Sequence, residues 1–141
     1  MSFLHQRKCL KVLICGGRNL DHSSVWNALE RDCLDMISYK LDLSARPKVV
    51  HVIHGGARGA DDAAGSWAKS EGAKVTVYKA NWHRHGKSAG PIRNQRMIDE
   101  GRPDVVVALP GGRGTQDMVN RATNSGIPVV ELSVYNSVMQ S

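Results

Sequence analysis

Short runs of apolar residues recur along the chain, and they predict five β-strands. Most of these runs alternate little with polar residues, so both faces of each strand are expected to be buried, as in a parallel sheet. The segment DVVVAL is rich in β-branched residues, which favours strand over helix in a run of this length. The predicted strands are 9–15, 49–53, 74–78, 104–109 and 128–132.

The segments between these runs have the apolar spacing of amphipathic helices. The predicted helices are 21–41, 60–71, a segment that carries Pro91 in its first turn and ends at Gly101, and a segment that follows 110–115 and ends near 125. In the first helix the expected core face consists of Val25, Trp26, Leu29, Cys33, Met36 and Ile37. The connection 79–91 is polar and lacks periodicity, so we expect a long loop there, and such loops often serve function.

Strands and helices therefore alternate along the whole chain. This order predicts a Rossmann-like, doubly wound α/β fold: a mainly parallel five-stranded sheet with helices on both faces and right-handed crossovers. The length of 141 residues is that of one domain, so we expect a single domain over 1–141.

Glycine-rich turns follow three of the predicted strands, and each turn contains an arginine. In an open parallel sheet all such turns lie at the same edge, where ligands bind. Glycine lets a ligand approach the backbone closely, and the helix that follows offers unpaired N–H groups to an anion. The turns are Gly16-Gly17-Arg18, Gly55-Gly56-Ala57-Arg58-Gly59 and Gly111-Gly112-Arg113-Gly114-Thr115. Structural turns of α/β proteins also use glycine, and this simpler interpretation stays open for each of them.

Charge and cysteine content narrow the class of partner. The formal net charge is +6, which favours an anionic partner such as a nucleotide or a nucleic acid. The three cysteines are odd in number and lack metal-ligand spacing, so we expect neither a disulfide framework nor a metal site, and no cofactor. His83 and His85 form an H-x-H pair, but no third ligand lies at a matching spacing. The chain lacks a signal-peptidase pattern and a run long enough for a membrane span, so we expect a cytoplasmic protein without a membrane partner.

Two common phosphate-binding motifs are absent. The spacing G-x-x-x-x-G-K-[ST] of P-loop NTPases does not occur, and GGARGADD does not fit G-x-G-x-x-G.

Four motifs resemble those of the SLOG superfamily, in the same order. They are GGR after the first strand, HGGARGADDAAGSWA, AGPIRNQRMID and LPGGRGT, and the resemblance extends from about Leu10 to Val130. It is closest to the YspA-type, YpsA-related branch of small proteins, many of them encoded by bacteria and phages. The resemblance implies a Rossmann-like fold that binds a nucleotide or a nucleotide-derived ligand, and assembly into homo-oligomers.

The resemblance also places AGPIRNQRMID in the pocket. Arg93 would bind phosphate and Asn94 would bond a sugar or a base edge, and Arg96 can share the helix face of Arg93. More distant LOG phosphoribohydrolases carry a catalytic glutamate three positions after the threonine of PGGxGT. Here that position is Met118, preceded by Asp117, which either substitutes for the glutamate or complements the helix dipole.

Several further residues are open to two interpretations. Asp61 follows the second turn and could bond a ribose hydroxyl or act as a base, or it could complement the helix dipole, as could Asp62. Trp82 could stack on a base or pack onto the core, and Trp26 and Trp67 are expected to pack. The expected ligand-binding set is Gly16, Gly17, Arg18, His54, Gly55, Gly56, Ala57, Arg58, Gly59, Asp61, Trp82, Lys87, Arg93, Asn94, Gly111, Gly112, Arg113, Gly114 and Thr115.

Three functions remain in competition. The first, which we favour, is a binding protein that senses or sequesters a nucleotide or an ADP-ribose-like derivative. The second is a LOG-like hydrolase that cleaves the N-glycosidic bond of a nucleoside 5′-monophosphate, with Asp117 and Asp61 as candidate catalytic residues. The third is nucleic-acid binding, by analogy with DprA of the same superfamily, although the basic residues do not form a run or a known nucleic-acid motif.

Overall fold

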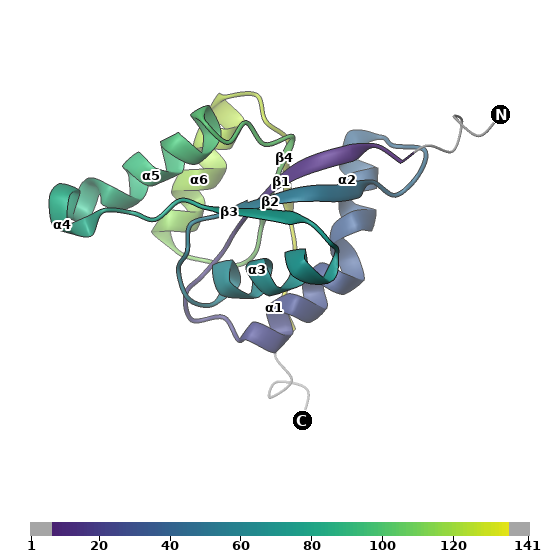
Figure 1. Ribbon diagram of the computed structural model, residues 1–141, viewed down its shortest axis with the longest axis horizontal. Coiled ribbons are helices and arrows are strands. Elements are labelled where there is room, and N and C mark those ends of the chain that lie inside the picture. The colour runs from purple at the N-terminus through teal and green to yellow at the C-terminus, as the bar shows by residue number, and fades with distance from the viewer. Residues whose placement is uncertain (1–6, 136–141) are drawn as a thin grey trace.

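A computed structural model describes residues 7–135. Strands and helices alternate as the apolar pattern predicts, and Figure 1 shows their arrangement. The elements are β1 (Cys9–Cys15), α1 (His22–Ala28), η2 (Leu29–Cys33), α2 (Leu34–Leu41), β2 (Lys48–His54), α3 (Ala60–Ser70), β3 (Lys74–Val77), α4 (Trp82–His85), η3 (Gly86–Ser88), α5 (Ala89–Asp99), β4 (Val105–Ala108), α6 (Arg113–Asn124) and β5 (Val129–Glu131). Within the described residues, no helix is both long and apolar enough to cross a membrane.

All five strands form one parallel sheet in the order β3-β2-β1-β4-β5. Val12 of β1 pairs with Val52 of β2 on one side and with Val105 of β4 on the other. From β1 the chain adds β2 and then β3 on one side of the sheet. It then crosses back and places β4 and β5 on the other side of β1. The fold is the predicted Rossmann-like α/β fold, and its strand order reverses between β1 and β4, where ligands bind in such sheets.

Helices cover the two faces of the sheet and create two buried apolar clusters. One face carries α1, α2 and α3, and its cluster includes Val12 of β1. The other face carries α5 and α6, and its cluster includes Leu13 of β1 together with Met97 and Met118. Figure 1 shows α1 and α3 on one side of the strands and α5 and α6 on the other. Adjacent β1 residues are therefore buried on opposite faces, which explains the unbroken apolar run.

The predicted first helix forms, but it contains a turn of π-helix at η2. The side chain of Asp21 caps it by accepting a hydrogen bond from the Ser24 amide at 3.1 Å. Its buried face consists of Val25, Ala28, Leu29, Cys33 and Ile37. Met36, in the α2 segment just after the π turn, lies outside this buried set. The prediction that Met36 belongs to the core face is consequently wrong, because its side chain is 41% exposed.

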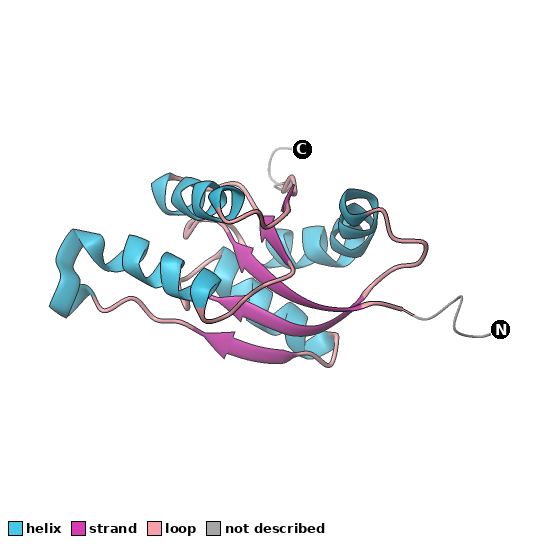
Figure 2. Cartoon of the chain, turned by 90° about the horizontal axis from the view of Figure 1, so that it is seen from above, coloured by secondary structure: helices cyan, strands magenta, loops and turns pink. Residues whose placement is uncertain are grey.

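The segment predicted as a long loop is also partly helical. It contains α4 and the 3₁₀ turn η3, and α5 begins at Ala89. The side chain of Asn81 caps α4 by accepting a hydrogen bond from the Arg84 amide at 3.0 Å. Periodicity could not reveal these turns, because they have no buried face. In Figures 1 and 2 this segment and the start of α5 extend beyond the sheet at its carboxyl edge.

Candidate functional site

A cavity of about 850 Å³ opens at the carboxyl edge of the sheet. It lies at the point between β1 and β4 where the strand order of the sheet reverses. The first and third glycine turns lie against each other in its wall, because the Gly17 amide donates a hydrogen bond to the Pro110 carbonyl at 2.8 Å. The cavity thus occupies the site that the topology of an open α/β sheet provides for ligands.

The structure brings most of the expected site residues into the wall of this cavity. They are Gly16, Gly17, Arg18, Gly55, Ala57, Asp61, Trp82, Lys87, Arg93, Asn94, Gly111, Gly112, Arg113, Gly114, Thr115 and Asp117. Segments that are distant in sequence therefore meet at one place. The wall also contains Asn19 and Leu20, which belong to none of the four motifs and are identified only by their positions after the first glycine turn.

Four expected residues do not line the cavity: His54, Gly56, Arg58 and Gly59. Gly59 joins the second turn to the first, since a Cβ at this position would overlap the carbonyl oxygens of Gly17 and Arg18. The Arg58 side chain is exposed. The second turn therefore contributes to the wall only in part, and the first and third turns form most of the glycine surface.

Glycine serves two different purposes in these turns. At Gly16 a Cβ would collide with the side chains of Ala60 and Leu109, so glycine allows the turn to pack between two elements. At Gly112 and Gly114 a Cβ would meet no atom within 4 Å, so the absence of side chains leaves open space beside the backbone. Those two glycines flank Arg113, the first residue of α6, where N–H groups lack helical partners. An anion can approach the backbone there.

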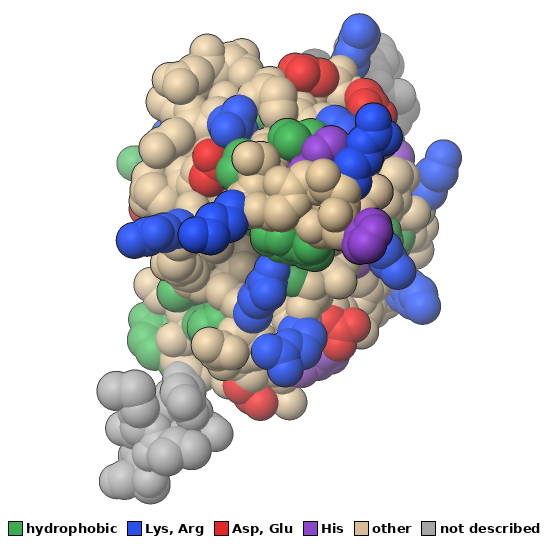
Figure 3. Space-filling model, turned by 90° about the vertical axis from the view of Figure 1, so that its left-hand side faces the viewer, with side chains coloured by type: hydrophobic (Ala, Val, Ile, Leu, Met, Phe, Trp, Pro, Cys, Tyr) green, Lys and Arg blue, Asp and Glu red, His purple; other side chains and the backbone are tan. Residues whose placement is uncertain are grey.

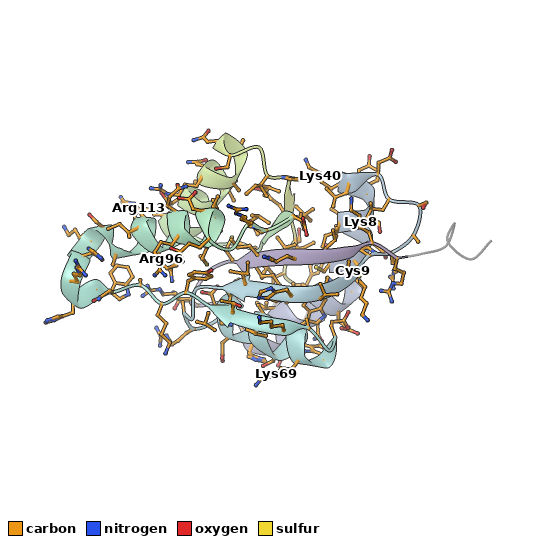
Figure 4. The ribbon with its side chains drawn as sticks, turned by 45° about the horizontal axis from the view of Figure 1, so that its top comes forward. Lys8, Cys9, Lys40, Lys69, Arg96 and Arg113 are labelled. Carbon is orange, nitrogen blue, oxygen red and sulfur yellow. The ribbon has the colours of Figure 1, made fainter. Side chains whose placement is uncertain are left out.

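The cavity wall contains four cationic side chains: Arg18, Lys87, Arg93 and Arg113. Among residues 7–135, no carboxylate forms an ion pair with any of the four. Figure 3 shows Lys and Arg side chains spread around this end of the molecule, and Figure 4 labels Arg113. Unpaired cations around exposed helical N–H groups favour an anionic occupant.

Arg93 is held by the backbone of neighbouring segments. Its Nη1 donates to the carbonyl oxygens of Gly55 at 2.7 Å and Tyr78 at 3.4 Å, and its Nε donates to Asn94 Oδ1 at 3.1 Å. Burial lowers the pKa of Arg93, and the carboxylate of Asp61 opposes that effect. These bonds leave Nη2 as the part of the guanidinium that can donate to a ligand.

Asn94 is buried, and both of its amide N–H groups are used within the protein. They donate to the Gly114 carbonyl at 3.2 Å and to Asp117 Oδ2 at 2.9 Å, while Oδ1 accepts from Arg93. Asn94 therefore fixes the glycine turn before α6 against α5. Sequence reasoning assigned it to a sugar or base edge, but its donors are already committed to this structural role.

Asp117 is held by two donors. Its Oδ2 accepts from Asn94 and from Arg121 Nε, the latter at 2.8 Å. Burial acts to raise the pKa of this carboxyl, but the hydrogen bonds from Arg121 and Asn94 outweigh it and lower the pKa below its ordinary value. The next residue, Met118, is 1% exposed and packs in the core between α6 and the sheet. The position of the LOG glutamate is thus an apolar core position here.

Asp61 differs from Asp117 in its environment. It is buried, lines the cavity and accepts a hydrogen bond from the Ala57 amide at 3.1 Å. Burial raises its pKa, and the Ala57 amide together with the charges of His54 and Arg93 offsets part of the rise. Its neighbour Asp62 is exposed and does not line the cavity.

Two further titratable groups lie beside Asp61. His54 is buried and accepts a hydrogen bond at Nδ1 from the Gly56 amide at 3.0 Å, and burial lowers its pKa against the opposing charges of Asp61 and Asp62. The thiol of Cys15 lines the cavity, but burial, with a smaller contribution from Asp61, raises its pKa to about 12. Cys15 is therefore a protonated thiol at neutral pH and a poor nucleophile.

Two of the three tryptophans pack in or against the core, and the third lines the cavity. Trp67 is 1% exposed and donates a hydrogen bond through Nε1 to Glu30 at 2.9 Å, and Trp26 packs at the edge of the same core. Trp82 lines the cavity instead, with the guanidinium of Arg18 5.6 Å from the centroid of its ring.

Arg96, labelled in Figure 4, does not line the cavity and pairs with Glu100. Among the described residues, no group of three His, Cys, Asp or Glu side chains could hold a metal ion.

Comparison with known sequences assigns this architecture to a family. The model of the YspA, cpYpsA-related SLOG family (YAcAr) matches residues 10–85. The gene 61 protein of Mycobacterium phage D29 is 41% identical to this chain over 128 residues, which cover 85% of this chain and 94% of the phage protein.

Two solved structures share the fold at low sequence identity. The structural-genomics target TM1055 has a TM-score of 0.56 and 19% identity, with 85% of this chain and 72% of that chain covered. The molybdenum cofactor binding protein of the phototrophic bacterium Rippkaea orientalis has a TM-score of 0.56 and 21% identity, with 96% of this chain and 81% of that chain covered. The sequence matches, supported by this shared fold, show that the chain belongs to the YspA, cpYpsA-related SLOG family.

Proposed function

We propose that the cavity binds a nucleotide or a nucleotide-derived molecule of the ADP-ribose type, as part of a sensing or sequestering protein. The observation that carries this proposal is the pairing of side-chain-free backbone with unpaired cations at one sheet edge. Gly112 and Gly114 leave space beside the start of α6, and Arg113 lies between them. Phosphate is the common anionic group that this combination of helix N-terminus and arginine recognises.

Charge supports a ligand with phosphate at one end and polar groups elsewhere. The wall combines four cations with two carboxylates, and Arg121 already pairs with one of these, Asp117. Asp61 is then the acceptor that remains for a sugar hydroxyl, which is a neutral donor. The volume of about 850 Å³ lies within the usual range for small-molecule sites, about 300–1,000 Å³.

Isothermal titration calorimetry tests the proposal. The protein is titrated at low salt with nucleoside 5′-monophosphates, nucleoside 5′-diphosphates, ADP-ribose, ribose 5-phosphate and inorganic phosphate. We expect saturable binding by at least one phosphate-bearing organic ligand, weakened in Arg113→Ala and retained in Lys40→Ala, which removes one charge from the exposed surface of α2. Absence of binding across the whole panel would contradict the proposal.

Hydrolysis of an N-glycosidic bond is the second candidate, and Asp61 is the observation that favours it. A buried carboxyl with a raised pKa, in the wall of a cavity, has the properties of a general acid. Asp117 lacks these properties, because Arg121 and Asn94 hold it ionised.

Chromatography of the products decides between the two candidates. Each nucleoside 5′-monophosphate is incubated with the protein, and release of free base is measured. A hydrolase of this kind would release base in the wild-type protein and lose activity in Asp61→Asn, while Asp117→Asn would retain more of it. A binding protein would release none in any variant, although ligand still binds.

A further inference from the structure

Trp82 lies at the surface of the cavity and does not belong to the core. Its side chain is 49% exposed, and neither buried apolar cluster includes it. It begins α4, the short helix that the Asn81 side chain caps. Gly90 lies near the edge of its ring, since a Cβ at that position would be 3.4 Å from Trp82 Cη2. The indole is therefore held beside the cavity by local backbone structure, and much of its surface remains free.

Arg18 approaches one face of the ring from another segment of the chain. It comes from the turn after β1, and its guanidinium carbon lies 5.6 Å from the indole centroid. Among residues 7–135 no carboxylate forms an ion pair with this guanidinium. A planar cation over an exposed aromatic face is a weak contact, and both groups also stack well on nucleotide bases.

We propose that Trp82 and Arg18 form a subsite for the planar base of a nucleotide, which stacks on the indole while its phosphate lies at the glycine turns. This inference rests on the proposed function and specifies one part of the ligand. Arg18 and Trp82 both line the same cavity as Gly112 and Arg113, so a single molecule can contact both regions.

The chemistry of the subsite determines what it selects. Stacking requires a planar aromatic ring, and every nucleotide base provides one. Ligands without a base therefore lose this contact.

A comparison of ligands and variants tests the subsite. Adenosine, guanosine, cytidine and uridine 5′-monophosphates are compared with ribose 5-phosphate by calorimetry. We expect the best nucleotide to bind roughly tenfold or more tightly than ribose 5-phosphate, and Trp82→Ala to remove this advantage. Trp82→Phe should retain most of it, because phenylalanine preserves an aromatic face. Tyr39→Ala, which removes an 87% exposed aromatic side chain from α2, is the matched control and should bind as the wild type does.

Tryptophan fluorescence provides a direct readout. Nucleotide binding should quench emission in the wild-type protein, and Trp82→Phe should still bind but show no such quenching, because Trp67 is buried and Trp26 packs against the core. Thermal unfolding of each variant verifies that the fold is intact. If ribose 5-phosphate binds as tightly as every nucleotide, the base subsite is wrong while phosphate recognition stands. If neither class binds, the proposed function fails together with the subsite.

Discussion

The arginines of the three glycine turns occupy different surroundings, although their sequence contexts are alike. Arg18 and Arg113 line the cavity, whereas Arg58 is exposed outside its wall. The sequence analysis placed Arg58 and Arg113 together in the expected ligand-binding set. Which arginine faces the cavity depends on how each turn enters its helix, and the backbone pattern alone does not specify that.

Replacement of these arginines distinguishes their roles. Arg113→Ala should weaken binding of a phosphate-bearing ligand about tenfold or more, because a charge-assisted hydrogen bond contributes about 1.5–3 kcal/mol. Arg58→Ala should have a smaller effect, through the general electrostatic field only. Calorimetry at fixed ionic strength measures both, and an equal loss in the two variants would show that the second turn also contacts the ligand.

His54 gives the protein a pH-dependent contribution to stability. Because burial lowers its folded-state pKa below the unfolded value near 6.5, the folded protein binds this proton more weakly. The contribution is complete above about pH 6.5 and is lost as the pH falls toward the folded-state pKa. His54→Asn keeps an acceptor for the Gly56 amide but does not titrate. Denaturant unfolding between about pH 7.5 and 5.5 should therefore show a steeper loss of stability in the wild-type protein than in His54→Asn, and parallel curves would refute the assignment.

At the scale of elements, contacts between turns hold the site together. Gly59 has a φ of 71°, and its Cα faces the carbonyl oxygens of Gly17 and Arg18. The Ala60 amide donates to the Gly17 carbonyl at 3.1 Å, so the start of α3 is attached to the first turn. Asn94 makes the corresponding connection between α5 and the third turn. The glycine motifs are thus partly ligand surface and partly connections between elements.

Two glycines with similar φ values provide a comparison that tests that connection. Gly72 has a φ of 72°, but a Cβ there would meet no atom within 4 Å. Gly72→Ala should cost about 1 kcal/mol, from the left-handed backbone alone. Gly59→Ala adds an overlap with backbone oxygens, at a ψ of −118° that side chains rarely combine with a positive φ. Its cost should therefore exceed that of Gly72→Ala by about 1 kcal/mol or more, on the order of other strained sites. Urea unfolding measures both, and equal costs would show that the turns adjust without strain.

The whole molecule is a sheet whose strand order reverses beneath the cavity, with cations gathered at that end. A ligand that binds only the folded chain must raise the free energy of unfolding. At a ligand concentration of about one hundred times Kd the gain is about 2.7 kcal/mol, which should raise Tm on the order of 5–10 °C. Thermal unfolding with each calorimetric ligand measures this, and an unchanged Tm with a tight binder would indicate binding to the unfolded chain as well.

Homo-oligomer assembly and nucleic-acid binding stay predictions at this scale.

Apolar pattern and turn chemistry were sufficient to predict the five strands, the α/β class and the edge where the glycine turns gather, because burial on both faces leaves an unbroken apolar signature. The same pattern could not predict α4 and η3, which have no buried face, or the exposure of Met36 beside the π turn. Only the tertiary structure decided the roles of individual polar residues. It committed the donors of Asn94 to the Gly114 carbonyl and to Asp117, and it buried Asp61 in the cavity wall. Those outcomes depend on contacts between segments far apart in the chain, whereas the strands and turns depend on residues that are neighbours in sequence.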